Sequence, residues 1–309
     1  MDRSGVLTPT TTASSRLGPR DPEFCTATRS KGRGSPWAKD CAASDDRERS
    51  GWGDEATVSA YVSNFGPVSD EIAQVLAARA ARSELTVLDL CCGHGALTAM
   101  LCQAGANVFG IDLSDKMLER ARRAAPRATF IKCDAAQLPF QEEAFDAVVC
   151  NFGMLHLSHR ARSLAEVRRV LRPGGDFLTA TWAIPQASNA FGIMLDAIRA
   201  HADLACAPHQ PDFFALARAS TAQKMMAGAG LRLTAHDEMT PLLRLQHPDE
   251  LFTIFLTATV SVSMLIRSQP DEIVARIRRD VAAAVAANCT AGGGYLVPLP
   301  VVIMNASRT

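Results

Sequence analysis

Two acidic residues flank a glycine-rich turn at a spacing that is typical of nucleotide recognition. Residues 87–90 (Val-Leu-Asp-Leu) indicate a buried strand, and the chain then turns through Gly93 and Gly95. Glycine lets the backbone approach a ligand closely. Asp112 lies 23 positions after Asp89, at the end of the next apolar run. A carboxylate there can accept two hydrogen bonds from the vicinal diol of a ribose. The alternative is a strand-end aspartate that contacts only solvent.

Alternating strands and helices position these residues. A doubly wound α/β fold is predicted, because short connections join the alternating elements. Ser114 and Ser158 are the predicted N-caps of two of the helices. The predicted strands are 86–90, 107–112, 128–133, 145–150 and 176–182, and the helices between them are 96–103, 114–125 and a segment from 158 to about 171.

Ligands of such sheets bind beyond the carboxyl ends of the strands. The glycines and polar residues at those ends are therefore the candidates for a binding site. They are Gly93, Gly95, Asp112, Asp134, Asn151 and His156.

The segments on either side of this region differ from it in composition. Residues 1–55 are rich in Ser, Thr, Arg, Gly and Pro and are predicted to be disordered. Two interpretations of this segment are left open, an organelle transit peptide and a tail without function. Two amphipathic helices are expected within 57–82, broken at Gly66-Pro67 and close to the mouth of the ligand site.

Beyond Ile184 the alternation of strands and helices lapses. The apolar helices that follow are expected to form a substrate cap over about 184–290, and 295–304 is the predicted final strand. The expected helices are 189–206, 221–230, 251–266 and 271–287, with a strand at 231–239.

Composition excludes several classes of function. The formal net charge is +0, which argues against a general nucleic-acid-binding surface and against a polybasic membrane anchor. No Cys-x-x-Cys pair occurs, so no metal site is expected and reduced thiols are the simplest interpretation. The apolar run 251–266 is short for a membrane span. We therefore expect a cytoplasmic protein without stable membrane insertion.

The ordered motifs resemble class I S-adenosylmethionine-dependent methyltransferases. The resemblance is strong over about 56–183 and is nearest to the branch of ubiquinone, menaquinone and natural-product methyltransferases. It rests on the glycine motif 87–95, on Asp112 with 113–118, on Asp134-Ala135 with Leu138-Pro139-Phe140, on 145–149 and on 169–175.

This resemblance implies a seven-stranded Rossmann-like sheet whose last strand runs antiparallel. It also implies S-adenosyl-L-methionine as the cofactor. Cys91 is a departure, since the family has glycine there, and its Cβ would crowd the methionine portion. The implied cofactor-binding residues are Asp89, Cys91, Gly93, Gly95, Asp112, Leu113, Met117, Asp134, Ala135 and Asn151.

Methyl transfer from a sulfonium is an in-line displacement, in which the protein mainly aligns the acceptor and excludes water. His156 is the best candidate base if the acceptor must lose a proton, and a structural role is its alternative. Tyr61 is expected to act in a lid over the cofactor, or to pack in the core. His94 either touches the cofactor's carboxylate or points to solvent.

Absent motifs narrow the acceptor. The residues after the fourth strand are Asn-Phe-Gly-Met (151–154) rather than Asn-Pro-Pro-Tyr or Asp-Pro-Pro-Tyr, and no Pro-Cys dipeptide occurs. These absences argue against methylation of DNA bases. The sequence favours transfer to oxygen or carbon of a small, largely apolar molecule of quinone-precursor or secondary-metabolite type, and a homodimer is left open. The alternatives are a NAD(P)-dependent oxidoreductase and a catalytically silent S-adenosylmethionine-binding protein.

Overall fold

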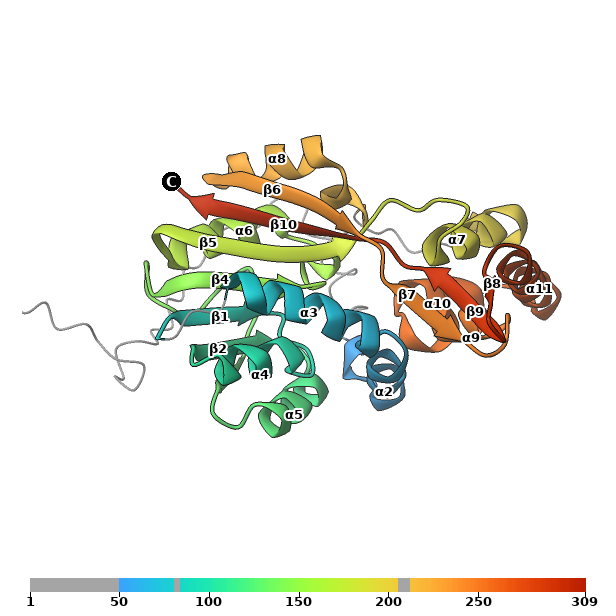
Figure 1. Cartoon of the computed structure of the whole chain (residues 1–309), viewed down its shortest axis with the longest axis horizontal. Helices are drawn as coiled ribbons and strands as arrows, with labels where there is room; N and C mark the ends of the chain where they lie inside the picture. Colours follow the sequence, from blue (N-terminus) through green and yellow to red (C-terminus); the bar gives the residue numbers. More distant parts are fainter. Residues whose placement is uncertain (1–49, 81–83, 205–211) are drawn as a thin grey trace, which may run out of the picture.

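The computed structural model describes residues 50–80, 84–204 and 212–309 (Figure 1). The prediction of disorder for 1–49 lies outside these residues. Residues 50–53 are helical, so the predicted tail extended too far, and the ordered chain includes Trp52.

A seven-stranded sheet forms the centre of the molecule, in the order β3-β2-β1-β4-β5-β10-β6. Strand β10 runs antiparallel to both of its neighbours, and the pairs formed by β1 to β5 are parallel. The predicted fold class is therefore confirmed. The strands are β1 (Thr86–Leu90), β2 (Asn107–Asp112), β3 (Thr129–Lys132), β4 (Phe145–Asn151), β5 (Leu171–Trp182), β6 (Leu231–Met239) and β10 (Val301–Arg308).

Helices cover the sheet and extend beyond one of its ends. Figure 1 shows α7, α9, α10 and α11 gathered beside a small sheet of β7 (Leu242–Leu245), β8 (Thr290–Ala291) and β9 (Gly294–Pro298). These elements include most of the predicted cap. The helices are α2 (Glu55–Asn64), α3 (Gly66–Ala80), α4 (Ala96–Gln103), α5 (Asp115–Ala124), α6 (Arg160–Val170), α7 (Ala190–His201), α8 (Ala219–Gly228), α9 (Glu250–Ala258), α10 (Ser261–Arg267) and α11 (Asp271–Asn288).

Local sequence explains the elements nearest the site. In β1 the side chains of 87–90 are all buried, as expected for a central strand covered on both faces. The predicted cap at Ser114 is confirmed, because its hydroxyl accepts a hydrogen bond from the Met117 amide at 3.1 Å. Ser158 does not cap α6, since His159 holds that position without a side-chain bond.

Two predicted elements are each divided in the structure. The strand expected at 295–304 is two strands, because β9 pairs with β7 in the small sheet and only β10 joins the main sheet. The chain turns between them at Leu299-Pro300, and proline cannot donate to a sheet ladder. The helix expected at 251–266 is divided into α9 and α10.

Within residues 50–80, 84–204 and 212–309, no single helix combines the length and the hydropathy that a membrane span needs. The helices α9 and α10 reach those values only together, and their axes are bent by 107°.

Gly95 begins α4 and fixes how that helix packs on α5. Its φ is +87°, and an added Cβ would lie 2.7 Å from the Ala121 Cα. We expect Gly95→Ala to reduce the free energy of unfolding by about 3 kcal/mol, because backbone strain and overpacking add. Gly293→Ala is the control, since its φ is +94° and nothing lies within 4 Å of an added Cβ.

Gly293→Ala is expected to reduce the free energy of unfolding by only about 1 kcal/mol, because it introduces backbone strain without overpacking. Urea unfolding of both variants measures the difference. Equal losses would contradict the packing role of Gly95.

Candidate active site

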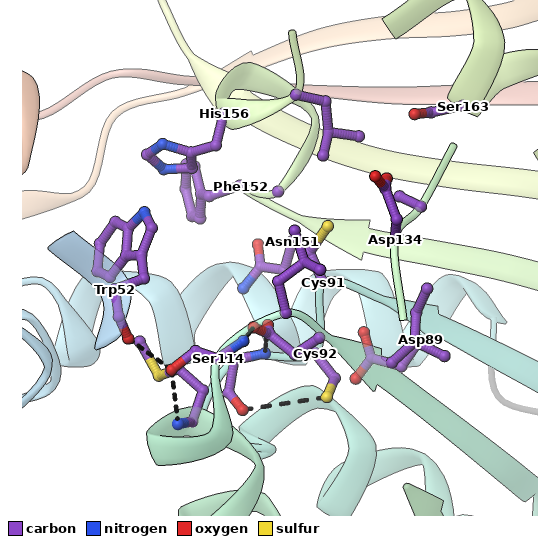
Figure 2. Close-up of a pocket in the computed structure, with 18 of the residues that line it drawn as sticks. Trp52, Asp89, Cys91, Cys92, Ser114, Asp134, Asn151, Phe152, His156 and Ser163 are labelled. Carbon is purple, nitrogen blue, oxygen red and sulfur yellow. Dashed lines mark hydrogen bonds between the residues drawn. The ribbon is translucent and has the colours of Figure 1, made fainter. Parts of the chain in front are cut away.

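A pocket lies at the carboxyl ends of β1, β2, β3 and β4. Every cofactor-binding residue expected from the sequence lines it except Gly95, which packs against α5 instead. Trp52 and His156 lie on one side of the pocket, and Asp89 and Asp134 lie on the other (Figure 2). The predicted residues that share the pocket are Tyr61, Asp89, Cys91, Gly93, Asp112, Leu113, Met117, Asp134, Ala135, Asn151 and His156.

Asp112 organises the loops around it. One carboxylate oxygen accepts from the Gly93 amide at 3.0 Å and the other from the Ser114 amide at 2.8 Å. Burial nevertheless raises the pKa of this carboxyl, against those two hydrogen bonds. The site thus holds a carboxylate at the expected ribose position, with its oxygens fixed by the backbone.

Asp89 is almost completely buried, with 1% of its surface exposed. It accepts a hydrogen bond from the Thr98 hydroxyl at 2.5 Å. Burial raises the pKa of Asp89 to about 7, and the hydroxyl only partly offsets this. A cationic ligand beside it would favour the ionised form, since opposite charges lower the pKa of an acid.

Asn151 carries an unsatisfied acceptor into the pocket region. Its amide nitrogen donates to the Ser69 carbonyl at 2.9 Å and to the Ser69 hydroxyl at 3.1 Å. Its side-chain oxygen is buried and has no hydrogen-bond partner among the described residues. An unpaired buried acceptor is costly, so a ligand donor at this point would be stabilising.

Asp134 and its neighbours close the far side of the pocket. The Asp134 carboxylate accepts from the Ala136 amide at 2.8 Å, which fixes the turn after β3. Cys133, Ala135 and Ala136 line the pocket beside it. The pocket therefore has a polar end formed by Asp134 with a small apolar surface next to it.

Cys91 is accommodated by Gly153, which lies in the loop that follows the neighbouring strand β4. The φ of Cys91 is +57°. A Cβ added at Gly153 would lie 2.4 Å from the Cys91 Cβ and 2.9 Å from the Cys91 sulfur. The Cys91 side chain therefore occupies space that Gly153 leaves open beside Cys150. A hydrogen bond with Cys150, together with burial, raises the pKa of the Cys91 thiol.

This arrangement predicts that Gly153→Ala destabilises the protein by about 2 kcal/mol through overpacking. Cys91→Gly in the same chain removes two of the three close contacts and should restore at least half of that loss. Urea unfolding of the two single variants and the double variant measures the coupling. Cys102→Ala combined with Gly153→Ala is the control double variant. Cys102 belongs to α4, so its substitution should restore none of the lost stability. Purely additive losses would refute the pairing of Cys91 with Gly153.

A second cavity adjoins the pocket and is largely aromatic. Trp52, Tyr61 and His156 line both spaces. Among the residues that the structure describes, the lining of the second cavity contains no Asp, Glu, Lys or Arg. Its other lining residues are Phe65, Trp182, Phe191, Leu195, Phe213, Phe214 and 258–262, from α7 and from the turn between α9 and α10, among others.

His156 lies at the junction of the two spaces. Its ring meets Trp52 edge-on at 5.3 Å and Phe213 edge-on at 5.5 Å, measured between ring centres. Trp52 also meets Tyr61 edge-on at 5.2 Å, and its carbonyl accepts a hydrogen bond from the Ser114 hydroxyl at 2.5 Å. The imidazole thus lies between Trp52, which lines both spaces, and Phe213, which lines the second cavity.

The sequence did not identify two sets of site residues. Trp52 fell in the segment predicted to be disordered, and only its large apolar ring distinguished it there. The aromatic wall of the second cavity comes from elements far apart in the chain, as Phe65 and Trp182 illustrate with ring centres 5.8 Å apart. Spacing along one helix or strand could not reveal such a cluster.

Residues 87–175 match the family model described as a methyltransferase domain. The chain is 38% identical over 110 residues to the demethylmenaquinone methyltransferase of Beutenbergia cavernae, over 36% of this chain and 46% of that protein. It is also 38% identical over 104 residues to the 2-phytyl-1,4-naphtoquinone methyltransferase of Nostoc punctiforme, over 31% and 45% of the two chains. This segment is a class I methyltransferase domain. The family resemblance is confirmed.

The match of the methyltransferase domain spans less than half the length of these two curated relatives. Solved structures extend the likeness in fold. A candidate methyltransferase of Bacillus halodurans aligns with a TM-score of 0.51 at 21% identity, over 77% of this chain and 98% of that one. The YcgJ protein of Bacillus subtilis aligns with a TM-score of 0.50 at 20% identity, over the same shares. The chain thus shares the fold of these smaller proteins and carries additional elements.

Proposed function

We propose that the protein is an S-adenosylmethionine-dependent methyltransferase that acts on oxygen or carbon of a small, largely apolar molecule of quinone-related type. The observation that carries this proposal is the aromatic cavity that shares Trp52, Tyr61 and His156 with the pocket of the methyltransferase domain. A methyl acceptor in that cavity would lie next to a cofactor in the pocket. The same three side chains would then exclude water from the reacting atoms.

The pocket fits the cofactor on chemical grounds. Asp112 offers acceptors to a ribose diol, and the buried unpaired oxygen of Asn151 offers one to a donor group. Nothing lies within 4 Å of an added Cβ at Gly93, so the loop leaves open space beside the backbone. When bound, S-adenosylmethionine supplies an electrophilic methyl group on a sulfonium centre.

His156 and Tyr61 take different roles in this proposal. His156 accepts the proton of an acceptor hydroxyl, since imidazole is the side chain that changes protonation near neutral pH. Burial raises the pKa of Tyr61 to about 12, so its hydroxyl stays protonated and acts as a donor. Tyr61 therefore orients groups at the junction and does not remove protons.

The cavity supports an uncharged acceptor. A carboxylate or phosphate in this cavity would lose its hydration without a Lys or Arg among the described lining residues to pair with it. Flat rings are favoured because the walls are aromatic and packed on one another, as in the edge-on contact of Phe191 with Phe255 at 5.0 Å. We propose the elements within about 184–290 as the substrate cap, because α7 and the α9–α10 turn supply part of this wall.

Calorimetry with S-adenosylhomocysteine tests the cofactor, with NAD(H) as the comparison. Micromolar binding of S-adenosylhomocysteine alone is the expected result, and preferential binding of NAD(H) would transfer the protein to the oxidoreductases. A methyl-transfer screen then uses hydroxylated naphthalenes and phenols, with nucleic acid and charged amines as negative acceptors. Binding without turnover across the screen would favour a silent cofactor-binding protein.

A further inference from the structure

His94 is held inside the cofactor pocket. It lies between Gly93 and Gly95, whose φ angles are +54° and +87°. Its side chain is only 18% exposed and lines the pocket of the methyltransferase domain. The alternative in which His94 points to solvent is therefore wrong.

Asp70 of α3 holds one side of the imidazole. The His94 Nε2 lies 3.4 Å from the Asp70 Oδ1. That oxygen is buried, and it forms no hydrogen bond among the described residues, so the ion pair is its polar contact. Because α3 is a fifteen-residue helix with a buried face, it provides a fixed support for the ring.

The second ring nitrogen of His94 remains available to a ligand. Within the part of the chain that the structure describes, Nδ1 forms no hydrogen bond or ion pair. An imidazolium that pairs with Asp70 through Nε2 presents the N–H of Nδ1 as a charged donor. A charged donor in a partly buried pocket is suited to an anion.

Asp89 is a second acidic group that interacts with His94, and both side chains line the pocket. The charge of His94 lowers the pKa of Asp89, against the larger effect of burial. An imidazole and a carboxyl group therefore line the same pocket. An α-amino acid group is the complementary ligand, since it carries one ammonium and one carboxylate.

We infer that His94, held by Asp70, binds the carboxylate of the amino-acid portion of the cofactor. His94 is then a binding residue and Asp70 a positioning residue. The inference rests on the proposed function, because it requires the cofactor in this pocket.

The test compares two ligands by calorimetry. S-adenosylhomocysteine contains the amino-acid portion, whereas 5′-methylthioadenosine lacks it and keeps the nucleoside. His94→Gln is expected to weaken S-adenosylhomocysteine about 10-fold and to leave methylthioadenosine within about 2-fold, since one charge-assisted hydrogen bond is lost. Asp70→Asn should weaken the binding of S-adenosylhomocysteine by a smaller factor and should also leave methylthioadenosine nearly unchanged.

His201→Gln is the matched control. His201 pairs with Asp280 between α7 and α11 at 2.6 Å and does not line the pocket, so neither ligand should change. The methyl ester of S-adenosylhomocysteine adds a second check, because the ester should bind the wild-type protein and the His94→Gln variant equally.

Two results would overturn the inference. One is an equal loss of both ligands in His94→Gln, which would assign His94 to the shape of the loop. The other is unchanged binding of S-adenosylhomocysteine in that variant. If the wild-type protein binds neither ligand, the proposed function itself fails, and the unmodified chain identifies that case before any variant is made.

Discussion

Asp112→Ala is expected to weaken S-adenosylhomocysteine binding by about 100-fold. The variant removes the proposed acceptors for the two ribose hydroxyls, and hydrogen bonds to a charged group contribute about 1.5–3 kcal/mol each. It also frees the amides of Gly93 and Ser114, which the carboxylate holds at 3.0 and 2.8 Å. Calorimetry on the folded variant gives the affinity, and thermal unfolding shows whether the loops have loosened.

Ligand analogues separate these two effects. A 2′,3′-dideoxy analogue of methylthioadenosine cannot bond Asp112 through its ribose, so its affinity should be similar for the wild-type protein and the variant. A 100-fold loss of the dideoxy analogue as well would show that Asp112 acts only by holding the loops. Asp115→Ala is the control, since Asp115 begins α5 three positions after Asp112 and its side chain is largely exposed, at 66%.

Asp89 makes the stability of the fold dependent on pH. Its pKa of about 7 in the folded protein lies above the ordinary value of 3.8, so the folded chain binds the proton more tightly than the unfolded chain. Stability from this group is complete below about pH 4 and is lost as the pH rises to about 7. The full difference is on the order of 4 kcal/mol.

Asp89→Asn should reduce this pH dependence. The variant is expected to be more stable than the wild-type protein at pH 8, by up to about 4 kcal/mol, and to change less between pH 5 and pH 8. Urea unfolding at the two pH values measures both quantities. Asp196→Asn is the control, because Asp196 is about half exposed on α7 and should leave the pH dependence unchanged.

A pH dependence that is the same in Asp89→Asn and in the wild-type protein would refute the role of Asp89. Some dependence should persist in the variant, because burial also raises the pKa of Asp112. The buried acid is retained at a cost in stability, which is common where a site must meet a cationic ligand. Asp89→Asn should accordingly weaken S-adenosylhomocysteine while it stabilises the chain.

Local patterns were sufficient to predict the sheet and most of the pocket. The bounds of β1, β2, α4 and β6 agree with the ranges predicted from the sequence. The side chains at the carboxyl ends of the strands then meet because parallel strands bring those ends to one edge. Asp89 and Asp112 are examples, since β1 and β2 pair in register.

The second cavity could not be predicted in the same way. Its walls combine Phe65 from the end of α2, Trp182 from the end of β5 and the turn between α9 and α10. Each of these side chains alone looks like ordinary core packing. The division of 251–266 was also hidden, because the apolar pattern continues through Thr259-Val260 although the helix axis bends there.

The chain leaves and re-enters the main sheet at a single place. Met239 of β6 pairs with Val301 of β10, and the Leu299 amide donates to the Pro241 carbonyl at 2.9 Å. The sixty or so residues between these points, which include α9 to α11 and the small sheet, therefore form an insertion with adjacent ends. Such a segment can be exchanged or shortened without cutting the cofactor-binding strands. Of the described lining of the second cavity, this module contributes residues 258–262, so its exchange would alter one part of that wall and leave the other aromatic side chains in place.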